Sequence, residues 1–155
     1  GQYSVPDVPT VPVRLAGIDA LAQLDTGFND TVHAHSININ QALVTAVLNA
    51  NSSALVRDSS LDLTLSTCVG VSEPVEGYRL GAGTTFDFVT PDGGVARAEH
   101  DALIFAKNTP MAAKVCGGIG TWTVPAAQVA GSFYVDDQVI VFDAISSRVW
   151  VPRAP

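Results

Sequence analysis

The sequence predicts a single all-β domain with one or two short helices. Many short apolar or alternating segments follow one another, and Gly- and Pro-rich turns separate them. Hydrophobic residues make up 47% of the 155 residues and charged residues only 15%, which is typical of a globular chain. A chain of this length forms one ordinary domain with its own core. We therefore expect residues 1–155 to form one domain.

The expected strands lie at short intervals along the whole chain. They are residues 11–15, 20–24, 61–65, 85–89, 95–98, 102–106, 121–124, 139–142 and 148–151. A turn at residues 16–19 joins the first two. Leu61, Leu63 and Leu65 alternate with polar residues, as in a half-buried strand. The sequence "PDGG" at residues 91–94 consists of residues that strongly favour a turn, and it predicts a hairpin.

One segment has a helical pattern instead. Residues 36–48, "SININQALVTAVL", place apolar side chains at helical spacing and predict a helix. These apolar residues are Ile39, Leu43, Val44, Val47 and Leu48.

Charge and hydropathy exclude several classes of partner. The net charge is -7 and the pI about 4.6, which argues against nucleic acid, because binding it requires clustered Lys and Arg. No apolar run approaches the ~20 residues that span a bilayer, so no membrane span is predicted. No signal peptide is recognised, yet the beginning at Gly1-Gln2 resembles a trimmed end and is compatible with export.

The cysteine pair, Cys68 and Cys116, has two interpretations from the residues alone. Both could be buried thiols, or they could form one disulfide that closes a long loop and contributes ~3–4 kcal/mol. One pair of cysteines is too few for a cysteine zinc site.

The sequence Asp25-Thr26-Gly27 directly follows the apolar segment at residues 20–24. It could be a turn in which the aspartate bonds its own backbone and Gly27 adopts a positive φ. It could also be half of a catalytic dyad. In such a dyad two carboxylates share one proton, and one activates water while the other protonates the substrate carbonyl. Asp25 supplies only one of the two carboxylates.

The motif and what surrounds it resemble the aspartic peptidases. "LDTG" after "VPVRLAGIDALAQ" is similar to their catalytic loop, and "LDTGFNDTV" is especially like the retroviral form. Over residues 11–152 the order of features resembles the C-terminal lobe of a pepsin-like enzyme. After the loop come a helix candidate, a strand with a cysteine ("LDLTLSTC"), a hairpin ("TFDFVTPDGGVARAEHDALIF"), a second cysteine ("KVCGG"), and a closing segment that begins with Val129-Ala130-Gly131.

This resemblance implies roles for individual residues. Asp25 would be a catalytic aspartate, and Thr26 would make the hydroxyl bonds that tie two catalytic loops together. Gly27 would allow the backbone to approach the substrate closely, and Gly131 would pack behind the catalytic loop.

The resemblance also implies that Cys68 and Cys116 form the disulfide of the C-terminal lobe. Phe28 is a departure, because pepsin-like enzymes carry Ser or Thr at that position and bond the carboxylate with it. Retroviral enzymes carry an alanine there, so the large ring could reshape the site without abolishing activity.

The function that the resemblance implies is an aspartic endopeptidase half-site without a metal or other cofactor. The second aspartate is expected from an N-terminal lobe, present as a separate chain or elsewhere in a longer protein, or from a second copy of this chain. The lobe is favoured by the pepsin-like order of the second half. The alternatives are a catalytically inactive pepsin-like module that binds peptides or proteins, and a homodimeric retropepsin-like peptidase.

Other residues give weaker signals. His33 and His35 are two positions apart, with no third metal ligand at a suitable spacing, and are expected to be loop histidines. Ser132 lies in "AGSFY", which is not a nucleophile-elbow motif. Asn29 begins a glycosylation sequon, and a glycan there would crowd the site. The crowding favours a source without N-glycosylation, such as bacteria. Together with the acidic, Ala/Val/Gly-rich composition, it predicts a secreted or cell-surface protein of bacterial origin.

Overall fold

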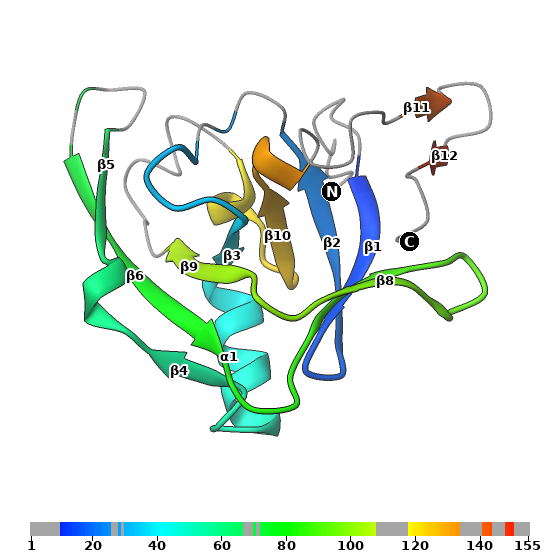
Figure 1. Ribbon diagram of the computed structural model, residues 1–155, viewed down its shortest axis with the longest axis horizontal. Coiled ribbons are helices and arrows are strands. Elements are labelled where there is room, and N and C mark those ends of the chain that lie inside the picture. The colour runs from blue at the N-terminus through cyan, green and yellow to red at the C-terminus, as the bar shows by residue number, and fades with distance from the viewer. Residues whose placement is uncertain are drawn as a thin grey trace.

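A computed structural model describes residues 10–25, 28, 30–66, 70, 72–107, 118–133, 141–143 and 148–150 of the chain. It confirms the all-β class. The described part forms a ten-stranded curled sheet, a separate two-stranded sheet and one α-helix (Figure 1). No helix in the described part is long and apolar enough to cross a membrane.

The large sheet brings together strands from distant parts of the chain. Its order is β4-β6-β9-β3-β10-β2-β1-β7-β8, and β5 pairs with β6. Its strands are β1 (Thr10–Leu15), β2 (Ile18–Leu24), β3 (Ser36–Asn40), β4 (Leu55–Arg57), β5 (Leu63–Ser66), β6 (Ser72–Leu80), β7 (Phe86–Val89), β8 (Val95–Glu99), β9 (Leu103–Lys107) and β10 (Ala126–Val129). The small sheet pairs β11 (Val141–Asp143) with β12 (Arg148–Trp150). Strand β10 therefore enters the middle of the large sheet late in the sequence.

Two hairpins match the sequence predictions closely. β1 and β2 pair antiparallel, and the turn needs only Ala16 and Gly17, with φ of 51° and 82°. Two successive positive φ values suit the right-handed twist of a tight hairpin. β7 and β8 pair across the predicted "PDGG" turn, with an irregularity in register after Phe88.

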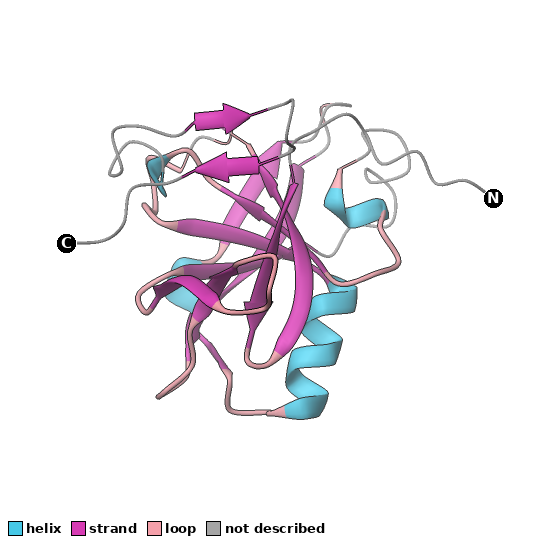
Figure 2. Ribbon diagram, turned by 90° about the vertical axis from the view of Figure 1, so that its right-hand side faces the viewer, coloured by secondary structure: helices cyan, strands magenta, loops and turns pink. Residues whose placement is uncertain are grey.

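The main core lies between one face of the sheet and the helix α1 (Gln41–Ala50), which packs against β2, β3, β9 and β10 (Figure 2). Its fully buried large residues come from several strands and the helix: Val13, Leu15, Ile37, Ile39, Leu43, Val47, Phe86, Ile104 and Val129. A smaller cluster of Leu61, Val75 and Phe105 occupies the other face. The sheet is therefore covered on both faces in its central part.

The predicted helix at residues 36–48 is wrong in its first part. Residues 36–40 form β3, and the helix begins only at Gln41. β3 lies between β9 and β10 and is buried throughout, so tertiary pairing overrides the local helical pattern. Ile37 and Ile39 face the main core, while Asn38 and Asn40 alternate onto the opposite face.

Other strand predictions differ from the structure. Residues 119–121 form the short 3-10 helix η2 (Ile119–Thr121), and the strand follows as β10, whose Ala-rich sequence has low β-propensity. Leu61 ends the 3-10 helix η1 (Ser59–Leu61), so that strand begins only at Leu63. β4 and β6 were not predicted. β6 contains a proline and Gly77, residues that are unusual inside a strand. The glycine allows a close approach, because a Cβ at Gly77 would lie 2.4 Å from Cβ of Leu61.

Asn40 is the polar residue that joins β3, α1 and the segment before β10. It is 1% exposed, and its Oδ1 caps the helix by accepting from the Leu43 amide at 3.0 Å. The same oxygen accepts from the Ala126 amide at 3.1 Å. Its Nδ2 donates to three backbone carbonyls, those of Ile119, Trp122 and Val124, at 3.3, 3.1 and 2.8 Å. One side chain therefore fixes the approach of β10 to β3.

We expect Asn40→Ala to lower the free energy of unfolding by about 3 kcal/mol or more, because it removes a helix cap and leaves buried carbonyls unpaired. Urea unfolding measures this change. Asn51→Ala is the matched control, because Asn51 is exposed and its side chain bonds the neighbouring Ser53. Its cost should stay under about 1 kcal/mol. Equal costs for the two variants would contradict the role assigned to Asn40.

Candidate active site

Asp25 lies at the point where two parallel strands end side by side. β2 and β10 run parallel, and Leu24, the last residue of β2, is opposite Val129, the last residue of β10 (Figure 1). The Asp25 amide donates to the Val129 carbonyl at 3.3 Å and continues the ladder by one bond. The backbone of Asp25 is therefore held by a strand far away in the sequence.

The loop after Asp25 is tied to the end of β10. The Phe28 amide donates to the Asp25 carbonyl at 3.1 Å. The Gly131 amide donates to the Phe28 carbonyl, also at 3.1 Å. The structure thus places Gly131 against the loop. Thr26 and Gly27, together with Cys68 and Cys116, lie outside the described residues, so their expected roles stay predictions.

The carboxylate of Asp25 accepts a hydrogen bond from a glutamine that sequence reasoning missed. Nε2 of Gln128 on β10 donates to Oδ2 of Asp25 at 2.7 Å. Oε1 of Gln128 in turn accepts from Nδ2 of Asn38 on β3 at 3.1 Å. Gln128 is the one polar residue in the segment "AAQV", and Asn38 is one of three polar residues that alternate with isoleucines in "SININ".

A lysine contributes to the electrostatics of the site. Lys107, at the end of β9, is half-buried, and burial lowers the pKa of its ammonium group below the usual value. The negative charges of Asp25 and Glu73 act in the opposite direction and raise the pKa of Lys107. A cation is thus within electrostatic reach of the Asp25 carboxylate.

A second aspartate, Asp30, braces the loop instead of facing outward. Its Oδ1 accepts from the Ser132 amide at 3.3 Å, and its Oδ2 accepts from the Ser132 hydroxyl and, at 3.4 Å, from the Ser36 amide. Oγ of Ser132 also accepts from the His35 amide at 2.8 Å. His35 has a φ of 57°, a left-handed conformation that a histidine tolerates better than bulkier residues. Ser132 therefore bonds both ends of the connection from Asp30 to β3.

The two loop histidines point to different neighbours. The His33 ring stacks on Phe105 with ring centroids 5.9 Å apart, and the His35 ring packs against Phe133 at 5.1 Å. They lie in a bend and not in a strand. Within the described ranges, no group of three or more His, Cys, Asp or Glu could hold a metal ion.

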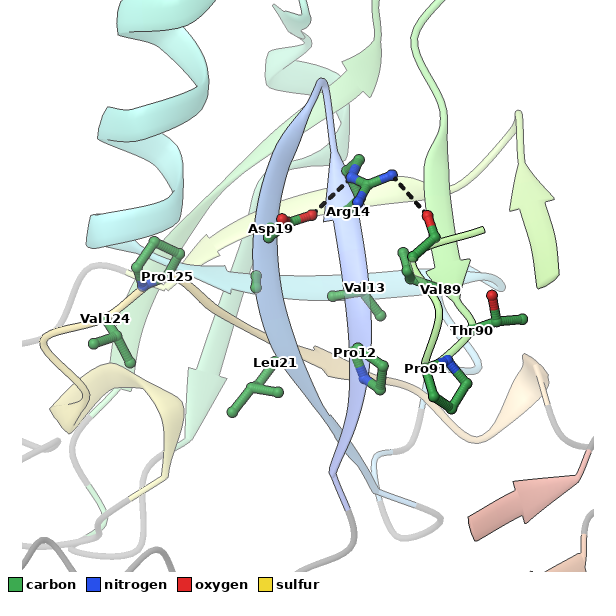
Figure 3. Close-up of a pocket in the computed structure, with 12 residues that line it drawn as sticks. Pro12, Val13, Arg14, Asp19, Leu21, Val89, Thr90, Pro91, Val124 and Pro125 are labelled. Carbon is green, nitrogen blue, oxygen red and sulfur yellow. Dashed lines mark hydrogen bonds and ion pairs between the residues drawn. The ribbon is translucent and has the colours of Figure 1, made fainter. Parts of the chain in front are cut away.

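A groove of about 510 Å³ lies at the other end of β2 (Figure 3). Its walls come from β1, β2, the β7–β8 turn and the segment before β10, with Pro12, Leu21, Pro91, Val124 and Pro125 as apolar lining residues. Arg14 borders it and bonds Asp19 at 2.7 Å. The residues that line this groove do not include Asp25.

Comparison with solved structures finds a similarity over nearly the whole chain. The chain is similar to the retroviral protease-like domain of Ddi1 from Leishmania major, with a TM-score of 0.43 and 12% sequence identity. The similarity covers 96% of this chain and 94% of that chain. No family model matches the chain, and neither does any curated protein.

We expect Ser132→Ala to loosen the loop between Asp25 and β3. Loss of the hydroxyl removes one bond to Asp30 and one from the His35 amide, so hydrogen exchange of that amide should speed up about fivefold to tenfold. NMR-detected exchange gives the rate. Ser60→Ala is the matched control, because Ser60 donates to Asp58 at 2.6 Å elsewhere on the surface. An unchanged His35 rate in Ser132→Ala would contradict the bracing role.

Proposed function

We propose that this chain is one half of an aspartic peptidase site, with Asp25 as its catalytic carboxylate. The observation that carries the proposal is the position of Asp25. Its backbone is bonded to the end of β10, and its carboxylate is held by the Gln128 amide at 2.7 Å. A carboxylate fixed in this way can bind and activate a water molecule with little reorganisation.

The chemistry requires a second carboxylate beside the first. Two aspartates that share one proton allow one to take a proton from water while the other gives a proton to the peptide carbonyl. Among the described residues, Asp30 is the nearest aspartate along the loop, but it is engaged by Ser132 and the Ser36 amide. We therefore assign the second aspartate to another lobe or chain, either an N-terminal lobe or a second copy of this chain.

Phe28 is compatible with this function. Both backbone groups of Phe28 hold the loop, the amide to Asp25 and the carbonyl to Gly131. Any residue except proline can supply these two bonds, so the loop does not depend on a Ser or Thr side chain at this position. The side chain of Phe28 is half-buried.

The proposed substrate is a peptide or an unfolded protein segment. A site made from two halves leaves an open cleft between them, which suits an extended chain. We further propose that the protein acts outside the cell or at its surface, as the composition indicates.

We expect Asp25→Asn to reduce cleavage of a mixed peptide library at least about 100-fold, because the amide can neither take nor give the catalytic proton. Mass spectrometry of the products, at acidic to neutral pH, measures the loss. Asp19→Asn is the matched control, since Asp19 is an exposed aspartate paired with Arg14, and this variant should keep full activity.

Undiminished cleavage by Asp25→Asn would contradict the catalytic assignment. If the wild-type chain, tested alone and with any partner lobe, binds peptides at this site without cleaving them, the protein is a binding module and the proposal is wrong.

A further inference from the structure

We propose that Gln128, oriented by Asn38, is the positioning residue that aims the carboxylate of Asp25 at the reacting water. This inference rests on the proposed peptidase function. It adds two residues from β10 and β3 to a site that the sequence motif places entirely in the loop after β2.

Strand register puts Gln128 on the same side as Asp25. In the parallel pair, Gln128 is opposite Gln23, and Asp25 is two residues beyond Gln23. Side chains alternate along a strand, so Gln23, Asp25 and Gln128 share one face of the sheet. Diagonal neighbours on one face are within reach of a long side chain, and the observed separation of 2.7 Å from Nε2 of Gln128 to Oδ2 of Asp25 agrees with this.

Asn38 determines which end of the Gln128 amide meets the carboxylate. Asn38 is opposite Gln128 in the antiparallel pair and is 2% exposed. Its Nδ2 can only donate, and Oε1 of Gln128 accepts from it at 3.1 Å. Rotating the Gln128 amide by half a turn would place Oε1 of Gln128 against the Asp25 carboxylate. It would also place the NH2 group of Gln128 against the NH2 group of Asn38. The two amides therefore form a directed chain that ends in a donor to Asp25.

The hydrogen bond from Gln128 restricts the direction in which the carboxylate of Asp25 points. Hydrogen bonds to a charged acceptor are stronger than neutral ones, and this bond lies in a partly buried setting. The side chain of Phe28 has no donor, so it cannot supply such a bond from the loop. The nearby cation, Lys107 on β9, acts on Asp25 through space and does not fix the direction in which the carboxylate points.

The first test reads the hydrogen bond directly and needs no activity. In the NMR spectrum of the full chain, we expect one side-chain NH2 proton of Gln128 to resonate downfield of those of Gln41, an exposed glutamine that bonds Thr45. Asp25→Asn should move the Gln128 proton upfield, because the acceptor loses its charge. Asn38→Leu should move it as well, because the amide is then free to rotate. A Gln128 signal that neither variant moves would overturn the inference.

The second test uses kinetics on the active assembly. Gln128→Met keeps the length of the side chain and removes the donor, so kcat should fall about tenfold or more while KM changes little. Gln128→Glu should be at least as impaired, because it sets a second acceptor against the carboxylate. Gln41→Met is the matched control and should keep the wild-type kcat. Circular dichroism confirms that each variant is folded.

The results separate the two proposals. If the wild-type chain cleaves peptides and Gln128→Met keeps the full kcat, the positioning role is wrong and the peptidase assignment stands. If the amide signal behaves as expected but no assembly cleaves peptides, the hydrogen-bonded chain is real and the proposed function is wrong. A fall in kcat together with the expected shift supports both.

Discussion

The pairing of β10 with β2 on one side and β3 on the other is the constraint on which the candidate site depends. Asp25 bonds Val129, Ala130 bonds Ser36, and Gly131 bonds Phe28, so three backbone bonds from the end of β10 hold the segment from Asp25 to β3. Gln128 and Asp25 are 103 positions apart in the sequence. The site therefore exists only when the late strand has entered the sheet, which is a long-range event in folding.

The face of the sheet opposite α1 carries a set of buried polar groups in its centre. Asn40 fixes the segment before β10, Asn38 orients Gln128, and Gln128 reaches Asp25. Buried amides are stable only when their donors and acceptors are paired, and these three are paired with one another or with backbone. Asn40 acts on the segment that leads into β10, and Asn38 acts on Gln128 within β10. The packing of β10 and the geometry of the proposed site therefore depend on the same strand.

The sequence predicted the fold class, the two hairpins and the position of Asp25 after a strand, because these depend on local alternation and turn chemistry. It missed β10 and β3, whose strand structure comes from burial between neighbours far along the chain. For the same reason it missed Gln128 and Asn38. Their importance arises from register across strands, which a motif confined to residues 25–27 cannot contain. The disulfide between Cys68 and Cys116 stays a prediction.

We propose that Asp25 forms half of a site that a second lobe or a second copy of this chain completes. Native mass spectrometry with a peptide inhibitor that carries a hydroxyl at the scissile position tests this most directly, because such transition-state analogues bind between the two carboxylates. We expect one inhibitor for every two aspartate-bearing polypeptides, either two copies of this chain or one copy with its lobe, and no binding by Asp25→Asn. One inhibitor bound tightly to a single copy of the chain would contradict the account.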